Sequence, residues 1–367
     1  MAPVGIHGVG IYLPEQVRGN DWWPATLVEQ WREKKKGHTV PSQSSWVERQ
    51  GDGPELPPLP GISRVIEALT ALKDDPFQGS RERRVAPDDV VASQLEVRAA
   101  RDAIARAGID ANEIGFLLSY SAVPDYLLTP NACAVHKQLG LPERCLSLAV
   151  EGACNSFALQ LNLAEKLISS GQYRYGLLVG SSLGSRVVPS QQPGSALFGD
   201  GAVAVVVGPV ADGYGVLGRS HHTDGTSHRG VVIGVPGKRW HDEGRNVFYV
   251  EDAELGRGLI LTVADHAKEC LEEALADAGM TKADVDFYAC HQGTAWIRQI
   301  TQEFAELGRA RSVDTFAWAG SLMGANLPLV FAVAEREGML RDGDVVTTFS
   351  GGLGETWSSL VLRWGKG

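Results

Sequence analysis

The chain has 367 residues, of which 44% are hydrophobic and 21% charged, fractions typical of a folded globular protein. Its 34 Lys and Arg against 44 Asp and Glu give a net charge of −10, which excludes a broad basic field for nucleic acid or a membrane surface. The length exceeds one small domain, so we expect two halves or a duplicated fold.

The first half alternates short apolar runs with helical periodicity. Its predicted strands are 4–14, 114–124, 145–150, 175–182 and 202–208, and its predicted helices are 93–107 and 155–170. Strands that are apolar on both faces indicate sheets covered by helices on each side, which is the α/β class.

Residues 31–80 interrupt this alternation. They are rich in Pro, Gly, Ser and charge, and a loop of this length is usually functional or mobile. We predict an insertion or lid here, with a short helix over VIEALTALK, residues 65–73.

The second half repeats the alternation. Its predicted strands are 214–220, 285–293, 344–352 and 358–364, and its predicted helices are 259–278 and 324–338. In each half a strand ends in a turn with polar residues and a helix follows, which favours a duplicated architecture divided into 1–210 and 211–367.

Four local features carry chemistry. Cys154 in EGACNSF precedes a helical pattern, where the helix N-terminus favours a thiolate, but a small buried cysteine fits equally well. His291 follows an apolar strand and is either an acid-base group or a core histidine. Two Gly-rich turns, in AGSLMGANLP and FSGGLGET, could offer backbone N–H groups to an oxyanion or could be ordinary tight turns.

In their order, these pieces together with GVGIYLPEQV, LFGDGAVAVVVG and TWSSLVLRW resemble the thiolase superfamily and, within it, the β-ketoacyl-acyl-carrier-protein synthase III family. The resemblance implies a five-layered α-β-α-β-α fold of two similar halves, built as a homodimer. It also implies that Cys154 is the nucleophile, that His291 is its partner, and that the backbone N–H groups of Cys154 and of Gly351 or Gly352 form the oxyanion hole.

The resemblance further implies substrate contacts. Leu127 and Leu128 in DYLLTPN would reach the partner subunit's acyl pocket, and Phe198 in LFGDG would line the pocket. Trp46 and Arg49 in SSWVERQ match part of the coenzyme A site. The second arginine of that site is missing, with Gln192 nearest, so an acyl-carrier-protein donor is at least as plausible as coenzyme A.

The chain departs from the family at one catalytic position. Where the family has Gly-Asn, this sequence has Gly320-Ser321, and a hydroxyl lacks the reach of an amide. Asn326, five residues on, is a weaker substitute and a candidate contact with the substrate. Asp125 and Glu151 are acidic residues near the expected pocket, and we favour structural roles for both over a role as base.

We therefore expect an acyltransferase that loads an acyl group from a thioester onto Cys154 and passes it to a carbon nucleophile in a Claisen-type condensation, in specialised metabolism. O- or N-acyl transfer is the alternative, since it needs no enolate. An inactive partner subunit is a third possibility, which the retained Cys154 and His291 disfavour.

We expect no cofactor apart from the coenzyme A or phosphopantetheine arm of the substrate. The five cysteines lack metal-ligand spacing, so we expect reduced thiols and no metal. The first residues lack the pattern of a signal peptide, and no run is long enough to span a bilayer, which predicts a cytoplasmic protein.

Overall fold

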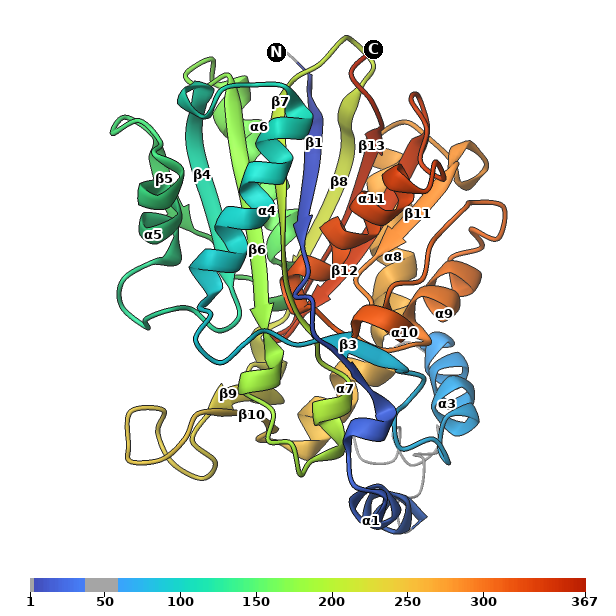
Figure 1. The fold of residues 1–367 in the computed structure, drawn as a ribbon. Coiled ribbons are helices and arrows are strands. Elements are labelled where there is room, and N and C mark those ends of the chain that lie inside the picture. The colour runs from blue at the N-terminus through green and yellow to red at the C-terminus, as the bar shows by residue number, and fades with distance from the viewer. Residues whose placement is uncertain (1–2, 37–58) are drawn as a thin grey trace.

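The computed structural model describes residues 3–36 and 59–367, which are built around two β-sheets (Figure 1). The first sheet has the order β1 (Val4–Tyr12), β7 (Asp200–Pro209), β6 (Tyr175–Leu183), β4 (Ile114–Ser121) and β5 (Leu146–Ala149). The second has the order β11 (Phe287–Cys290), β12 (Val345–Gly352), β13 (Thr356–Arg363) and β8 (Gly215–Thr223).

The two sheets share one topology. In the first, β1 and β6 are antiparallel to β7 and β4 runs parallel to β6. In the second, β8 and β12 are antiparallel to β13 and β11 runs parallel to β12. The chain therefore builds the same four-stranded arrangement twice, and β5 extends the first copy.

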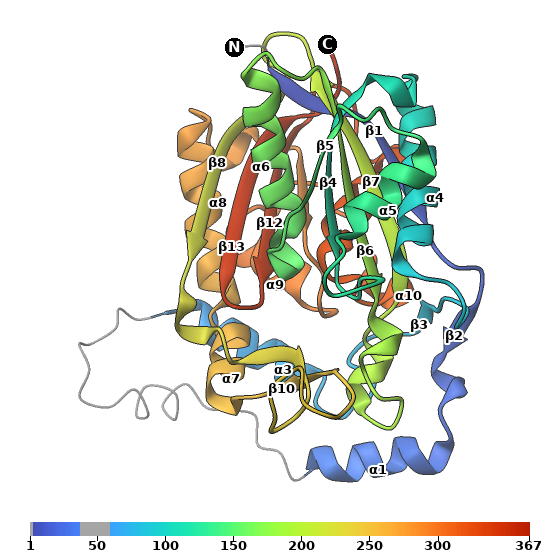
Figure 2. The same ribbon diagram turned by 90° about the vertical axis from the view of Figure 1, so that its left-hand side faces the viewer.

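Helices form three layers around the sheets (Figure 2). The outer face of the first sheet is covered by α4 (Ala92–Ala107) and α5 (Asn131–Leu139). Between the sheets lie α6 (Ser156–Ser169) and α11 (Asn326–Arg336), and the outer face of the second sheet is covered by α8 (Val263–Asp277) and α9 (Ile297–Phe304). The expected five-layered α-β-α-β-α arrangement is confirmed.

Small residues let α4 lie directly on β1. A Cβ added to Gly10 would be 2.2 Å from the backbone N of Ala103, so this strand position tolerates only glycine. The facing helix residues Ala99 and Ala103 are fully buried. Because the backbones of β1 and α4 are in direct contact here, the position of the helix on the strand is fixed.

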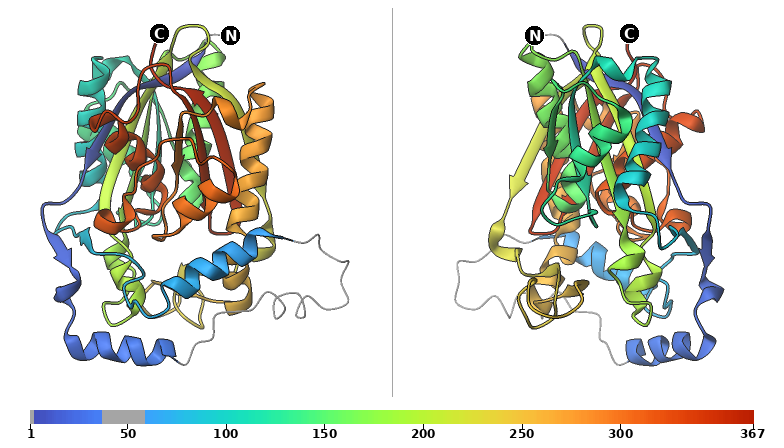
Figure 3. Two further views of the ribbon diagram at one scale, coloured as in Figure 1. Left: turned by 90° about the vertical axis from the view of Figure 1, so that its right-hand side faces the viewer. Right: turned by 60° about the vertical axis from the view of Figure 1, so that its left-hand side comes forward.

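Several smaller elements gather at the end of the sheets opposite the C-terminus (Figure 3). They are α1 (Ala25–Lys36), α3 (Gly61–Ala71), α7 (Ala253–Leu261) and the hairpin of β9 (Val231–Gly234) and β10 (Val247–Val250). A short pair, β2 (Val17–Gly19) and β3 (Glu82–Arg84), connects this end to the first sheet.

Two expectations about local structure need correction. The insertion predicted from residue 31 begins inside α1, where Trp31 is 1% exposed and its indole N–H donates to the Gln191 carbonyl at 2.9 Å. The single helix predicted over 259–278 is two helices that meet at Thr262. The helix predicted over 65–73 is confirmed as part of α3. Trp46 and Arg49 lie outside the described residues.

Across residues 3–36 and 59–367, the helices are too short or too polar to cross a membrane.

Candidate active site

A cavity of about 390 Å³ lies where the two halves meet. Its walls include six of the residues predicted from the sequence, namely Cys154, Phe198, His291, Ser321, Gly351 and Gly352. These residues span almost 200 positions of the chain, so the fold has brought them together. Much of the remaining wall is apolar, with Val231, Ile233, Phe248, Leu259, Ile260, Val263 and Ile297 among its residues.

Cys154 lies in a 3-10 turn, Ala153–Asn155, that leads into α6. Ala153 has a φ of 49°, a left-handed conformation that costs energy for any residue except glycine. The Ser156 hydroxyl stabilises the turn, since it donates to the Ala153 carbonyl at 2.8 Å and accepts from Gly152 N at 2.9 Å. The predicted position of Cys154 at a helix N-terminus is confirmed, and the residue as a whole is partly buried.

The second half of the chain holds this turn from the opposite side. The Ser350 hydroxyl donates to the Cys154 carbonyl at 2.8 Å, and the Asn155 amide donates to Ser358 Oγ at 2.8 Å. A Cβ on Gly352 would lie 2.3 Å from the Gly152 carbonyl oxygen, so at this position the backbone of β12 lies directly against the backbone of the Cys154 turn.

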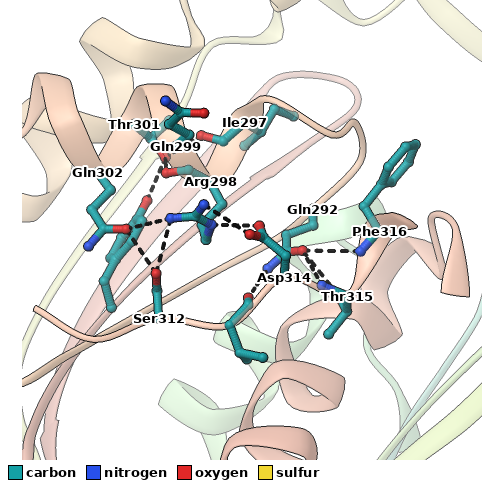
Figure 4. A network of polar contacts seen from close by, with 12 residues as sticks. Gln292, Ile297, Arg298, Gln299, Thr301, Gln302, Ser312, Asp314, Thr315 and Phe316 are labelled. Atoms are coloured by element: carbon teal, nitrogen blue, oxygen red, sulfur yellow. Dashed lines mark hydrogen bonds and ion pairs between the residues drawn. The ribbon is translucent and has the colours of Figure 1, made fainter. Parts of the chain in front are cut away.

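His291 directly follows β11, and its backbone N–H donates to the Phe349 carbonyl at 2.9 Å. The next residue, Gln292, fixes the loop behind it (Figure 4). The Gln292 side chain donates to the Val313 carbonyl at 2.7 Å and accepts from Thr315 N at 2.7 Å. Figure 4 also shows a neighbouring ion pair, in which the Arg298 guanidinium donates to both carboxylate oxygens of Asp314, at 2.6 and 2.9 Å.

The electrostatics of the cavity favour two neutral groups. Burial, with a contribution from the Glu151 carboxylate, raises the pKa of the Cys154 thiol to about 12. Burial lowers the pKa of His291 to about 4, and a contact with the Met323 backbone only partly opposes this. Desolvation therefore opposes the thiolate that the position at a helix N-terminus was expected to favour. At neutral pH the site holds a thiol and a neutral imidazole.

Ser321 lies in the turn between α10 (Phe316–Ala319) and α11. Its backbone N–H donates to the Leu197 carbonyl at 2.7 Å, and its hydroxyl accepts from Met323 N at 3.3 Å. Met323, like Ala153, has a left-handed φ, here 51°, so a second wall of the cavity carries a strained residue.

Asn326 holds this turn and does not line the cavity. Its side-chain oxygen accepts from Leu322 N at 2.7 Å, and its amide donates to the Gln292 carbonyl at 2.9 Å. Both ends of the amide are used inside a fully buried site, which leaves the expected contact with substrate without support.

The two leucines predicted to shape an acyl pocket are on the surface of this chain. Leu127 and Leu128 are 73% and 90% exposed, on the loop between β4 and α5, and neither lines the cavity. In the same loop the Asp125 carboxylate accepts from the Ser93 backbone at 3.0 Å and hydroxyl at 2.6 Å, which supports a structural role. Phe198 lines the cavity and packs edge-on against Phe248, with ring centroids 4.9 Å apart.

Sequence reasoning missed His266, Glu355 and Trp357, which also line the cavity. His266 Nε2 lies 3.3 Å from Glu355 Oε1, and the His266 ring stacks on Trp357 with centroids 4.0 Å apart. Glu355 belongs to a Gly-rich turn that the sequence had already marked. His266 lies within a helical pattern that gave no sign of it. Among the described residues, no group of three or more His, Cys, Asp and Glu is placed to hold a metal ion.

Comparisons with known proteins agree with this fold and site. Residues 148–225 match the family described as 3-oxoacyl-[acyl-carrier-protein (ACP)] synthase III, and residues 275–364 match its C-terminal part. β-Ketoacyl-[acyl-carrier-protein] synthase III 1 of Bacillus cereus is 31% identical over 325 residues, 86% of this chain and 98% of that protein. The synthase III of Bacillus pumilus is 30% identical over 291 residues, 78% of this chain and 88% of that protein.

Solved structures show the same fold. The 3-oxoacyl-(acyl carrier protein) synthase III FabH from Pseudomonas aeruginosa superposes with a TM-score of 0.77 at 25% identity, covering 99% of each chain. A variant of OleA from Xanthomonas campestris superposes with a TM-score of 0.76 at 20% identity, covering 99% of this chain and 98% of that one. The chain belongs to the β-ketoacyl-acyl-carrier-protein synthase III family of the thiolase superfamily.

Proposed function

We propose that the protein transfers an acyl group through a thioester on Cys154, taking it from an acyl-carrier protein or coenzyme A. One observation carries the proposal: the Cys154 thiol and the neutral His291 imidazole, from opposite halves of the chain, line one cavity. The turn that contains Cys154 is held by Ser350 and Gly352. The relatives are named β-ketoacyl-[acyl-carrier-protein] synthase III, and this name supports a thioester donor.

In the loading step Cys154 Sγ attacks the thioester carbonyl, and His291 takes the thiol proton. A neutral imidazole is the form that can accept a proton, so its lowered pKa suits this role. The backbone N–H groups of Cys154 and of Gly351 or Gly352 would stabilise the oxyanion. The C–S bond of the donor then breaks, the donor thiol leaves with the proton, and the acyl group remains on Cys154.

In the second step a carbon nucleophile attacks the acyl group in a Claisen-type condensation, as the family name suggests. The apolar walls built by the β9–β10 hairpin, α7 and α8 suit an acyl chain. A place in specialised metabolism fits the altered catalytic turn at Ser321. We expect no cofactor beyond the carrier arm of the substrate.

O- or N-acyl transfer is a second candidate, and one observation favours it. The position that would stabilise an enolate carries Ser321, and the nearby amide of Asn326 is fully used inside the scaffold. Transfer to oxygen or nitrogen forms no enolate, so it does not need that amide. An inactive partner subunit is disfavoured because Cys154 and His291 share the cavity.

We also propose a homodimer. Leu127 and Leu128 are exposed apolar residues on one loop, which suits a loop that enters a partner subunit. A cytoplasmic location stays a prediction from the sequence.

The test is intact-protein mass measurement after incubation with acetyl, butyryl and octanoyl donors, each on coenzyme A and on an acyl-carrier protein. We expect the mass of one acyl group on the wild type and none on Cys154→Ala. The proposal fails if no donor adds mass, or if Cys154→Ala still carries the group. Release of carbon dioxide from a malonyl thioester would then identify a decarboxylating acceptor.

A further inference from the structure

A second ionisable pair shares the cavity with Cys154, and the loading step has no use for it. His266 on α8 faces Glu355 in the turn between β12 and β13, with 3.3 Å between Nε2 and Oε1. Both side chains line the cavity and are largely buried, at 24% and 12% exposure. An imidazole beside a carboxylate is a group that can accept a proton from a neighbouring molecule.

The turn that carries Glu355 is fixed to the nucleophile turn. Thr356 Oγ1 accepts from the Asn155 amide at 3.4 Å, and Gly352 meets the Gly152 carbonyl through backbone. Glu355 itself has a φ of 61°, a conformation that persists for a non-glycine residue only where its surroundings impose it. The turn that carries Glu355 is therefore held against the segment that contains Cys154.

Trp357 sets the orientation of His266 and offers an internal comparison. Besides His266, it stacks on His222, with centroids 5.2 Å apart and planes 6° from parallel. His222 has its own carboxylate partner, Glu273, at 2.6 Å. His222 and Glu273 do not line the cavity, whereas His266 and Glu355 do. One tryptophan thus has a histidine-carboxylate pair within the cavity and a similar pair outside it.

We propose that Glu355 and His266 form the base that deprotonates the acceptor in the second step. This rests on the proposed acyl-Cys154 intermediate. The acceptor's hydroxyl, amine or activated carbon gives its proton to the pair, and that atom bonds to the acyl carbon. The bond to Cys154 Sγ breaks, its electron pair leaves on sulfur, and the thiolate regains a proton as the pair releases one.

The proposal assigns a class of acceptor. A malonyl group makes its carbon nucleophile by losing carbon dioxide, so it needs no base to remove a proton. An alcohol, an amine or the carbon between the two carbonyls of a β-ketoacyl thioester must lose one. The pair therefore points to a proton-bearing acceptor. Among these, an alcohol or an amine also fits the absence of the enolate-stabilising amide at Ser321, because neither forms an enolate.

The test separates loading from transfer in single-turnover experiments. Acyl-enzyme is made with the donor that loads fastest and is then mixed with hexanol, hexylamine, acetoacetyl-coenzyme A or malonyl-coenzyme A. His266→Phe keeps a ring on Trp357, and Glu355→Gln keeps the side-chain shape. His222→Phe is the matched control, since it changes the pair outside the cavity.

We expect all three variants to load Cys154 at nearly the wild-type rate. Transfer to the proton-bearing acceptor that the wild type uses should fall about 100-fold in His266→Phe and Glu355→Gln, a usual size for a lost general base, and stay unchanged in His222→Phe. If His266→Phe does not fold, Glu355→Gln alone still tests the proposed base.

Three results would overturn the inference, in ways that can be told apart. If the wild type never forms acyl-Cys154, the proposed function fails and the base fails with it. If the acyl-enzyme forms but both variants transfer at the wild-type rate, the pair is structural. If the wild type transfers to malonyl-coenzyme A alone, condensation stands and the proton-removing base is wrong.

Discussion

The hydroxyl of Ser350 donates a hydrogen bond to the backbone carbonyl of Cys154 at 2.8 Å, across 196 positions of the chain. The donor lies near the end of β12, a central strand of the second sheet, and the acceptor lies in the turn that leads into α6, between the sheets. The turn that contains the proposed nucleophile is therefore held in part by the other half of the chain.

Gly352→Ala should disrupt loading more than Gly351→Ala. The new Cβ at position 352 would meet the Gly152 carbonyl oxygen at 2.3 Å, and neither backbone can move away easily. At position 351 the nearest atom would be Phe349 Cζ at 3.8 Å, an ordinary contact. We expect the acyl-loading rate to fall about 100-fold for Gly352→Ala, a cost typical of a misplaced reacting group, and much less for Gly351→Ala. Equal losses in the two variants would contradict this.

The Cys154 thiol should react slowly with iodoacetamide at pH 8. Its pKa is raised to about 12, so little thiolate is present, and alkylation should speed up about tenfold per pH unit above that pH. Glu151→Gln removes the negative charge that contributes to this shift and should speed the reaction. Peptide mass mapping follows Cys154, with the exposed Cys133 of the same molecule as the internal control. Alkylation of Cys154 at a rate independent of pH would count against a neutral thiol.

His291 should make the protein less stable in acid. Its folded pKa of about 4 lies below its ordinary value of 6.5, so the unfolded chain binds more protons between these pH values. The free energy of unfolding should therefore rise with pH in that window, by about 1.4 kcal/mol per unit from this group. Urea titrations of the wild type and His291→Gln would measure it.

The wild type must be compared with His291→Gln because Glu96 also titrates in this range. Burial raises the pKa of Glu96 to about 7, so the contribution of Glu96 to the free energy of unfolding has the opposite sign and is lost as pH rises from 4.5 to 7. The difference between wild type and His291→Gln cancels Glu96 and should retain the positive slope. A difference that does not change between pH 4 and 6.5 would show that His291 titrates normally.

Ser321→Asn should increase any release of carbon dioxide from a malonyl thioester. The amide would extend further into the cavity than the hydroxyl does and could stabilise an enolate, and we expect a gain of about tenfold, below the usual cost of losing such a donor. Ser321→Ala, which removes the hydroxyl that accepts from Met323 N, is the control for a change of packing alone. An unchanged or lower rate in Ser321→Asn would reject this interpretation of the turn.

The central strands could be predicted because burial on both faces leaves a simple pattern. Val203 to Val207 of β7 are buried without a break, and apolar runs of this kind were sufficient to predict the sheets and the α/β class. Helix α1 was missed because its buried Trp31 stands at the edge of the charged run REKKK, so its apolar face is too narrow to show in the sequence.

The candidate site was only partly predictable for a related reason. Cys154, His291 and the glycine turns lie in short motifs whose order in the chain is informative. His266 has no such motif, and only the tertiary fold brings it to Glu355, 89 positions later. The raised pKa of Cys154 could not be predicted, because a helix N-terminus can be identified from the sequence, whereas the surrounding walls that exclude water cannot.

The repeated sheet has divided the chemistry between its two copies. The first copy contributes Cys154 and the second contributes His291, so under the proposed function neither copy would catalyse acyl transfer alone. The link between β7 and β8, residues 210–214, is short and joins the two copies. If the chain were divided there, we expect the two fragments to load an acyl group only after they associate. Thioester formation on Cys154 would then measure the association of the two copies.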